Sequence, residues 1–392
     1  MGNLGKKFVR KEKVKEEDDV DEDDKKRNEV RKEFQINFEK KIAKYIPPKI
    51  IFKGDVSKRS LLTKKVFATE FGASNVILFK QYIVLTEESV LYFYNKIFKP
   101  IFSKNFFEDS KKEEKEEEEE EEDEEILSLN AIDDQTIVIG ATDKVRIVNF
   151  YEKKRNQITY EIIQEIKDTK FYAINKKLSN GYLLLGGIDR KYAFYELKDK
   201  NSKISANNQY KLISKINLVH NVYDDDCPGV EDLNNGRILS WLNDDNNIKI
   251  IEYFPNQRII KSMNGYGLHN AGLICDKYLL LMGLTYPKYY TWLMDTETLE
   301  IVKLWKTPQN DCFNCSLGLN KFIYSSTYRI ACDELIVKNG KFIRKNLYET
   351  YYNKNKTEDW KNRFGVHLFL DEKTFVAIDF DGVIKVFYCG KD

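Results

Sequence analysis

The sequence predicts an all-β fold built from seven similar units that close into a ring. Apolar runs of strand length recur along the chain at intervals of roughly 40 to 55 residues. A polar turn precedes most of these runs, and a run dense in β-branched and aromatic residues follows each. After residue 50 no helical periodicity of comparable length competes with this pattern.

Residues 1–33 are expected to form a disordered, charged tail. A basic block is followed by an acidic one from Glu16 to Asp24, with few apolar residues that could build a core. Order begins near Phe34, where the apolar spacing fits either a strand or a helix that ends at Pro47 and Pro48. We therefore assign the folded domain to residues 34–392.

Each repeating unit is expected to hold a first apolar segment, a turn, a second run, another turn and a third run. The second runs begin at Ile83, Ile137, Leu183, Ile238, Leu279, Phe322 and Phe375. The third runs are Val90–Tyr94, Val145–Phe150, Tyr192–Tyr195, Ile248–Phe254, Tyr289–Leu293, Glu334–Val337 and Ile384–Tyr388. All seven prolines are expected between the runs, where no ladder hydrogen bond is lost.

An acidic low-complexity insert, residues 108–125, interrupts the first unit. It contains 14 acidic and 3 basic residues, so its net charge is −11 and the rest of the chain carries +12. Like charges at this density repel one another and do not pack, so we expect a solvated loop.

Seven strand-rich units at this spacing are typical of a seven-bladed β-propeller, in which each four-stranded blade packs against its neighbours. The alternative is an irregular two-domain β protein. Closing the ring requires one strand from the other end of the chain, and we expect Phe34–Phe38 or Ile50–Lys53 to supply it.

Three segments carry a resemblance to WD-repeat proteins. Phe375–Tyr388, which reads FVAIDFDGVIKVFY, resembles the second and third strands of such a repeat, and Ile238–Glu252 has the same form. Met294–Thr298 resembles the pattern that follows the Trp-Asp pair, with Met in place of Trp. The chain contains no Trp-Asp and no Gly-His pair, so the resemblance is to a divergent propeller. It implies a platform for protein–protein interaction and no chemistry.

The residues that catalysis usually needs are scarce. The only histidines are His220, His269 and His367, and none lies in a recognisable acid–base pattern, so we expect each to be packed or on the surface. We predict a non-catalytic scaffold with no catalytic residue and no cofactor; a propeller enzyme is a rival.

We also predict no metal site. Cys312 and Cys315 have the spacing of a zinc knuckle, but no second such pair or paired-His motif follows. The acidic stretch around Cys227, from Asp224 to Asp232, lacks the alternating ligands of a calcium loop and is expected to be a solvated loop.

The N-terminus suggests a second way of binding. Gly2 opens a sequence like an N-myristoylation signal, although Lys6 stands where Ser or Thr is usual. The basic residues that follow would add electrostatic attraction to an anionic membrane or to another anion. They are Lys6, Lys7, Arg10, Lys11, Lys13 and Lys15. The alternative function is therefore a peripheral membrane (anionic lipid) or nucleic-acid binding protein that uses this block and the basic propeller surface.

We expect a cytoplasmic protein whose partners are other proteins in a larger complex. No apolar stretch approaches a membrane span, and the charged N-terminus is no secretory signal. Membrane association through the N-terminus and a nuclear location both stay open, and nucleic acid has no motif in its favour.

Overall fold

The computed structural model describes a large part of the chain beyond residue 61. The described residues are 62–68, 75–87, 89–95, 99–107, 125–154, 157–167, 174–186, 191–217, 228–242, 247–254, 256–264, 267–275, 277–285, 288–306, 311–318, 320–326, 329–351, 364–369, 374–379 and 383–388. The chain divides into two units, Met1–Tyr45 and Ile46–Asp392. The first lies wholly outside the described residues, so everything below concerns the second.

The described strands form seven four-stranded antiparallel sheets. The first sheet orders β2 (Asn75–Phe79), β3 (Tyr82–Glu87), β4 (Val90–Asn95) and β5 (Pro100–Asn105). The second orders β6 (Ile126–Ala131), β7 (Thr136–Ala141), β8 (Val145–Lys154) and β9 (Gln157–Ile166). The third orders β10 (Ile174–Lys177), β11 (Leu183–Gly186), β12 (Lys191–Leu197) and β13 (Tyr210–Asn217). The fourth orders β14 (Pro228–Asp232), β15 (Arg237–Leu242), β16 (Asn247–Glu252) and β17 (Arg258–Asn264).

The remaining three sheets follow the same order. The fifth has β18 (Gly267–Ile274), β19 (Tyr278–Thr285), β20 (Lys288–Asp295) and β21 (Ile301–Lys306). The sixth has β22 (Asp311–Gly318), β23 (Lys321–Ser326), β24 (Arg329–Lys338) and β25 (Lys341–Tyr351). The seventh has β26 (Phe364–Phe369), β27 (Thr374–Asp379), β28 (Val383–Tyr388) and β1 (Leu62–Ala68).

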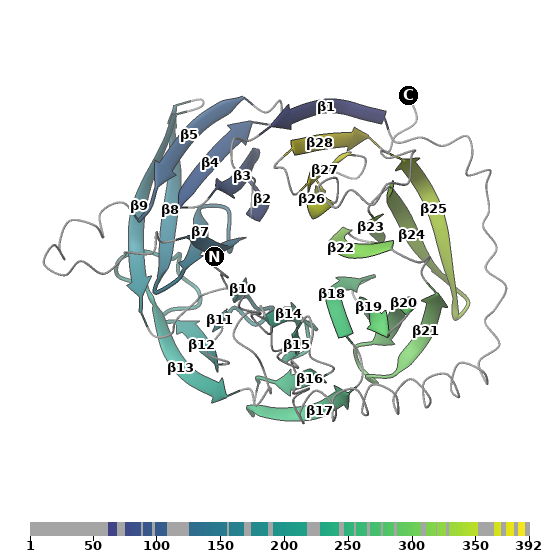
Figure 1. Cartoon of the computed structure of the whole chain (residues 1–392). Helices are drawn as coiled ribbons and strands as arrows, with labels where there is room; N and C mark the ends of the chain where they lie inside the picture. The colour runs from purple at the N-terminus through teal and green to yellow at the C-terminus, as the bar shows by residue number, and fades with distance from the viewer. Residues whose placement is uncertain are drawn as a thin grey trace, which may run out of the picture. The chain divides into compact units, whose positions relative to one another are not determined.

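These sheets form a closed ring. The first strand of each sheet contacts the first strand of the next, and β26 of the seventh sheet contacts β2 of the first. Figure 1 shows these strands on the inside of the ring and β5, β9, β13, β17, β21, β25 and β1 at its rim. The predicted all-β propeller fold is therefore confirmed.

The predicted repeat also gives the correct position of the second strand in each sheet. Each of the seven second runs forms the second strand of a sheet, from β3 to β27. The turns follow the chemistry expected of them: Asn234, Gly181 and Gly236 adopt positive φ angles of 60°, 88° and 78°. Lys80, in the turn before β3, also has a positive φ, of 55°.

Two expectations about the strands were wrong. The strand that closes the ring is β1, not Phe34–Phe38 or Ile50–Lys53, both of which lie outside the described residues. Its apolar residues, such as Val66 and Phe67, lie among Lys and Thr, as suits the rim. Pro100 and Pro228 begin β5 and β14 and do not lie between strands, because the first position of a strand tolerates the missing N–H.

A second repeat appears in the outer strand of each sheet. In every sheet its ladder with the third strand has a register shift that leaves one residue of the outer strand without an opposite partner, and the second sheet has a further shift between Glu152 and Lys154. These residues are Ile101, Ile163, Ile213, Ile260, Val302, Leu347 and Lys64. Six of the seven are aliphatic, so the fourth strands share a position that the search for apolar runs did not detect.

The core lies between the sheets. Each buried cluster combines the facing surfaces of two neighbouring sheets, and the cluster between the first and second is rich in phenylalanine. There the rings of Phe93 and Phe150 have centroids 4.9 Å apart, and Phe79 meets both edge-on. The aromatic residues therefore fill the spaces between blades, as strand alternation predicts.

Candidate interaction faces

The ring presents two faces, which we name by the direction of the chain. The leading face is the end at which each inner strand begins, for example at Ile126 and Pro228, and the trailing face is the other end. The acidic insert joins Asn105 of β5 to Ile126 of β6, and Asp224–Asp226 fall between Asn217 of β13 and Pro228 of β14. Both acidic runs therefore connect described strand ends of the leading face.

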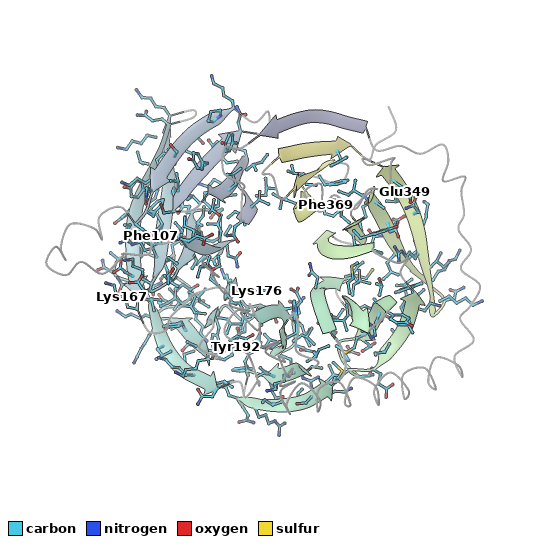
Figure 2. The ribbon with its side chains drawn as sticks, viewed as in Figure 1. Phe107, Lys167, Lys176, Tyr192, Glu349 and Phe369 are labelled. Carbon is cyan, nitrogen blue, oxygen red and sulfur yellow. The ribbon has the colours of Figure 1, made fainter. Side chains whose placement is uncertain are left out.

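The chain is firmly held where the acidic insert begins. Phe106 and Phe107 are buried, and the Phe107 N–H donates to Asn105 Oδ1 at 2.9 Å. Lys144 Nζ and the Arg146 guanidinium lie 5.7 Å and 5.0 Å from the centroid of the Phe107 ring (Figure 2). Cations over an aromatic face are attracted to its electron density. The last described turn before the insert is thus anchored by apolar burial and by two cations.

An ion-pair chain extends from this anchor along the leading face. Arg146 Nε donates to Glu165 Oε2 at 2.8 Å, and Lys167 Nζ lies 3.3 Å from Glu165 Oε1. Burial by itself raises the pKa of Glu165, but the hydrogen bonds from Arg146 and Lys167 outweigh it and bring the pKa below its usual value. Glu165 therefore stays ionised at neutral pH.

Polar side chains of the inner strands fasten one sheet to the next. Asn130 Nδ2 donates to the Asn175 carbonyl at 2.9 Å, and Asn175 Nδ2 donates to Ser128 Oγ at 2.8 Å. Asn75 Nδ2 donates to the Ile126 carbonyl in the same way between the first and second sheets. Because buried polar groups are costly unless paired, these bonds favour one relative position of the sheets.

A charged pair fastens the third sheet to the fourth. Lys176 Nζ on β10 donates to Glu231 Oε2 on β14, and Figure 2 places Lys176 on the inner side of the ring. The other oxygen of Glu231 accepts from the Leu273 N–H of β18 at 3.4 Å. The Glu231 carboxylate thus links its own strand β14 to the inner strands on either side, β10 and β18.

The prediction of a solvated loop from Asp224 to Asp232 was wrong at its end. Glu231 and Asp232 lie in β14, and Asp232 is only 6% exposed. Its carboxylate accepts from the N–H groups of Ser179 in the third sheet and Asn234, and from the Tyr253 hydroxyl. The physical reason is that these donors of the neighbouring turns satisfy the buried charge. Asp224–Cys227 lie outside the described residues.

The sequence itself holds a signal for this fastening. Lys176-Lys177 precede the turn of the third repeat, and Glu231-Asp232 precede the turn of the fourth at the same position. Opposite charges at one position of adjacent repeats predict contact once the repeat is known.

A separate ionic cluster lies in the sixth sheet. Asp333 is fully buried and accepts from Arg344 Nε and, at 2.8 Å, from Asn346 Nδ2. The Arg344 guanidinium also lies 4.7 Å from the Tyr324 ring centroid. Burial alone would lower the pKa of Arg344, but the charge of Asp333 raises it above its ordinary value.

The turn that carries the WD-like pattern is built by Asp295. Its Oδ1 accepts from the N–H groups of Glu297 and Thr298 at 2.9 Å and 3.0 Å, and the hydroxyl of Thr296 donates to the Lys277 carbonyl. Burial raises the pKa of Asp295, but these backbone donors and Lys277 bring it below its usual value. The pattern Asp-Thr-Glu-Thr therefore has a structural function here.

The histidines and cysteines of the described residues are spread over different sheets. His269 and His367 lie in β18 and β26, Cys312 and Cys315 lie in β22, and His220 and Cys389 lie outside the described residues. Cys332 is buried in β24, and Cys275 is half-buried. Within the described residues no three His, Cys, Asp or Glu side chains come together as a metal site would require.

The N-terminal candidates lie outside the described residues. Gly2, Lys6, Lys7, Arg10, Lys11, Lys13 and Lys15 all precede residue 62, so the acylation and the anion contact stay predictions. No helix within the described ranges has the length and apolar character of a membrane span.

No family model and no curated protein matches the chain. Solved structures do match. A chain of the mitotic checkpoint complex shares 11% identity over 88% of this chain and 99% of its own, with a TM-score of 0.58. Sqt1 of Saccharomyces cerevisiae shares 10% identity over 81% of this chain and 84% of its own, with a TM-score of 0.53. Virginiamycin B lyase of Staphylococcus aureus shares 11% identity over 83% of this chain and 98% of its own, also with a TM-score of 0.53. The chain therefore has the β-propeller fold, and the resemblance to WD-repeat propellers is confirmed at the level of the fold.

Proposed function

We propose that the protein is a non-catalytic scaffold that binds other proteins through the connections at the faces of its ring. The observation that carries this proposal is the use of the polar side chains on the inner strands. Asn130, Asn175, Lys176 and Glu231 fasten one sheet to the next. A ring held in this way keeps its connections at fixed positions, which lowers the cost of ordering them on binding.

The leading face is the surface that we assign to partner binding. Both acidic runs of the sequence join strand ends of this face, and Arg146 of the Arg146, Glu165 and Lys167 ion-pair chain lies against Phe107, the last described residue before the insert. Electrostatic complementarity steers association, so the partner would present a basic surface.

The structural neighbours agree with this proposal but do not decide it. One of them belongs to a mitotic checkpoint complex, which is an assembly of proteins, whereas another is a lyase. The same fold hosts both activities, so function has to be argued from the residues.

Two aspartates of the second sheet offer a matched test. Asp143 and Asp134 are both exposed; Asp143 lies between β7 and β8 on the leading face, and Asp134 between β6 and β7 on the trailing face. The full chain and the variants Asp143→Lys and Asp134→Lys would be used to capture binding proteins, with quantification by mass spectrometry at low and high salt.

We expect Asp143→Lys to weaken salt-sensitive partners by roughly fivefold or more and Asp134→Lys to leave them unchanged, because repulsion between like charges acts on one face only. A Gly/Ser replacement of residues 108–125 should weaken the same partners. Equal losses in both Asp variants, or no partner at all, would contradict the proposal.

A further inference from the structure

The tip of the β24–β25 hairpin carries an Asn-Gly pair. The ladder ends at Lys338 opposite Lys341, so Asn339 and Gly340 form a two-residue turn. Their φ angles are 53° and 68°, as a tight hairpin turn requires of both residues. Both are exposed, and apart from Gly340 and its two chain neighbours no heavy atom of the described residues lies within 4 Å of the position that a Cβ on Gly340 would take.

In a second Asn-Gly pair, Asn180-Gly181, both the Asn side chain and the Gly backbone nitrogen form hydrogen bonds. Asn180 Oδ1 accepts from the Tyr182 N–H at 3.1 Å, and the Gly181 N–H donates to the Leu178 carbonyl at 2.8 Å. Neither the side-chain amide nor the glycine nitrogen can move without losing a hydrogen bond.

The pair Asn235-Gly236 is held by its neighbours. Asn235 Nδ2 donates to the Thr296 carbonyl at 3.1 Å, and a Cβ at Gly236 would lie 2.8 Å from the Phe254 carbonyl oxygen. By contrast, the Asn339 side chain makes no hydrogen bond with any residue that the structure describes.

We propose that Asn339 is a site of spontaneous deamidation in the folded protein. The backbone nitrogen of Gly340 attacks Cγ of Asn339, a nitrogen–carbon bond forms, the bond from Cγ to Nδ2 breaks, and ammonia leaves with the proton of the Gly340 amide. Water then opens the cyclic imide at either carbonyl and gives aspartate or isoaspartate. Glycine favours this attack because it has no side chain to obstruct it.

The surroundings of the turn support the reaction. Only the end pair, Lys338 opposite Lys341, has to open before the side chain can reach the Gly340 nitrogen. The two lysine cations also favour the deprotonated amide that attacks. The product places a carboxylate between two lysines, and isoaspartate adds a methylene to the backbone of the two-residue turn.

Incubation of the full-length folded protein at mildly alkaline pH, followed by peptide mapping, tests this proposal. Peptides that contain Asn180, Asn235 and Asn339 are quantified over time for replacement of NH2 by OH and for isoaspartate. We expect Asn339 to convert at least roughly fivefold faster than the other two, the factor that one hydrogen bond of about 1 kcal/mol gives.

The same measurement in denaturant is the control, because there these three pairs should convert at similar rates. The fourth Asn-Gly pair of the chain, Asn264-Gly265, is left out of the comparison because Gly265 lies outside the described residues. Conversion of Asn180 or Asn235 as fast as Asn339 in the folded protein would overturn the proposal, as would an unmodified Asn339. If the ranking survived in denaturant, local sequence and not the fold would be its cause. The variant Gly340→Ala should slow the reaction at Asn339 alone.

Discussion

Tyr192 and Ser240 form a hydrogen bond that water does not reach. Both side chains are fully buried, and their oxygens lie 2.8 Å apart between the third and fourth sheets. Burial raises the pKa of Tyr192, so its hydroxyl stays protonated. A buried hydroxyl that loses its partner keeps the cost of its desolvation.

A double-mutant cycle tests this bond. Tyr192→Phe and Ser240→Ala should each lower the free energy of unfolding by about 1–2 kcal/mol, because each leaves one hydroxyl unsatisfied. The double variant should lose less than the sum of the two. Urea denaturation measures all four proteins, and strict additivity would show that the bond contributes nothing.

The buried pair in the sixth sheet should be more costly to break. Arg344→Met leaves the fully buried Asp333 without its counter-charge, and we expect a loss of about 3–5 kcal/mol. Adding Asp333→Asn should recover part of this loss. Arg258→Met is the control: Arg258 is paired with Glu252 but is 66% exposed, so its loss should stay below about 1 kcal/mol.

Two tyrosines make stability sensitive to alkaline pH. Burial raises the pKa of Tyr210 and of Tyr253 from 10.0 to about 12. Below pH 10 both states hold the proton; between pH 10 and 12 the unfolded chain ionises first, so the folded state loses stability as pH rises. Urea midpoints should fall across this window, and less steeply in Tyr253→Phe; an equal slope in both proteins would contradict the assignment.

At the scale of elements, residues at equal positions of successive repeats contact each other and hold neighbouring sheets together. Lys176 and Glu231 occupy such positions and form an ion pair that is about one quarter exposed (27% and 20%). The pair can select the correct neighbour because a like-charge pair at this place would be repelled.

Charge reversal tests this matching. Lys176→Glu should destabilise the protein by about 1–3 kcal/mol, because it faces Glu231 with a second carboxylate. Combining it with Glu231→Lys should restore most of the loss, and hydrogen exchange should show protection returning in β10 and β14. A double variant no more stable than Lys176→Glu would mean that the charges do not fasten the sheets.

The elements were predicted unequally from sequence. The second and third strands are recognisable in the sequence as dense apolar runs, because both of their faces are covered. Fourth strands do not: β13 has Tyr210 buried but Lys211, Leu212 and Ile213 exposed, so its apolar and polar residues follow no simple period. The rim faces solvent, and the register shift breaks the alternation as well.

At the scale of the whole molecule, stability depends on a strand from near the beginning of the folded unit. β1 pairs with β28 along Leu62–Ala68 and completes the seventh sheet. The ring therefore joins distant parts of the chain, and the free edge of β28 would be exposed without it.

Two truncations test this closure. A chain that begins at Ile46 keeps β1 and should unfold cooperatively at nearly the full-length temperature. A chain that begins at Thr69 lacks β1 and should melt at a lower temperature or aggregate through the free edge of β28. Equal melting of both chains in calorimetry would show that β1 is dispensable.

The sequence by itself determined the repeat, and with it the all-β propeller fold, because strand-length runs and turn residues are local signals. Only the tertiary structure decided which strand closes the ring, that Glu231 and Asp232 belong to an inner strand, and that the strand ends joined by the acidic runs lie at one face. Those facts depend on contacts between residues far apart in the chain, such as Ser179 with Asp232 and Leu62 with Tyr388, which a pattern within one repeat does not encode.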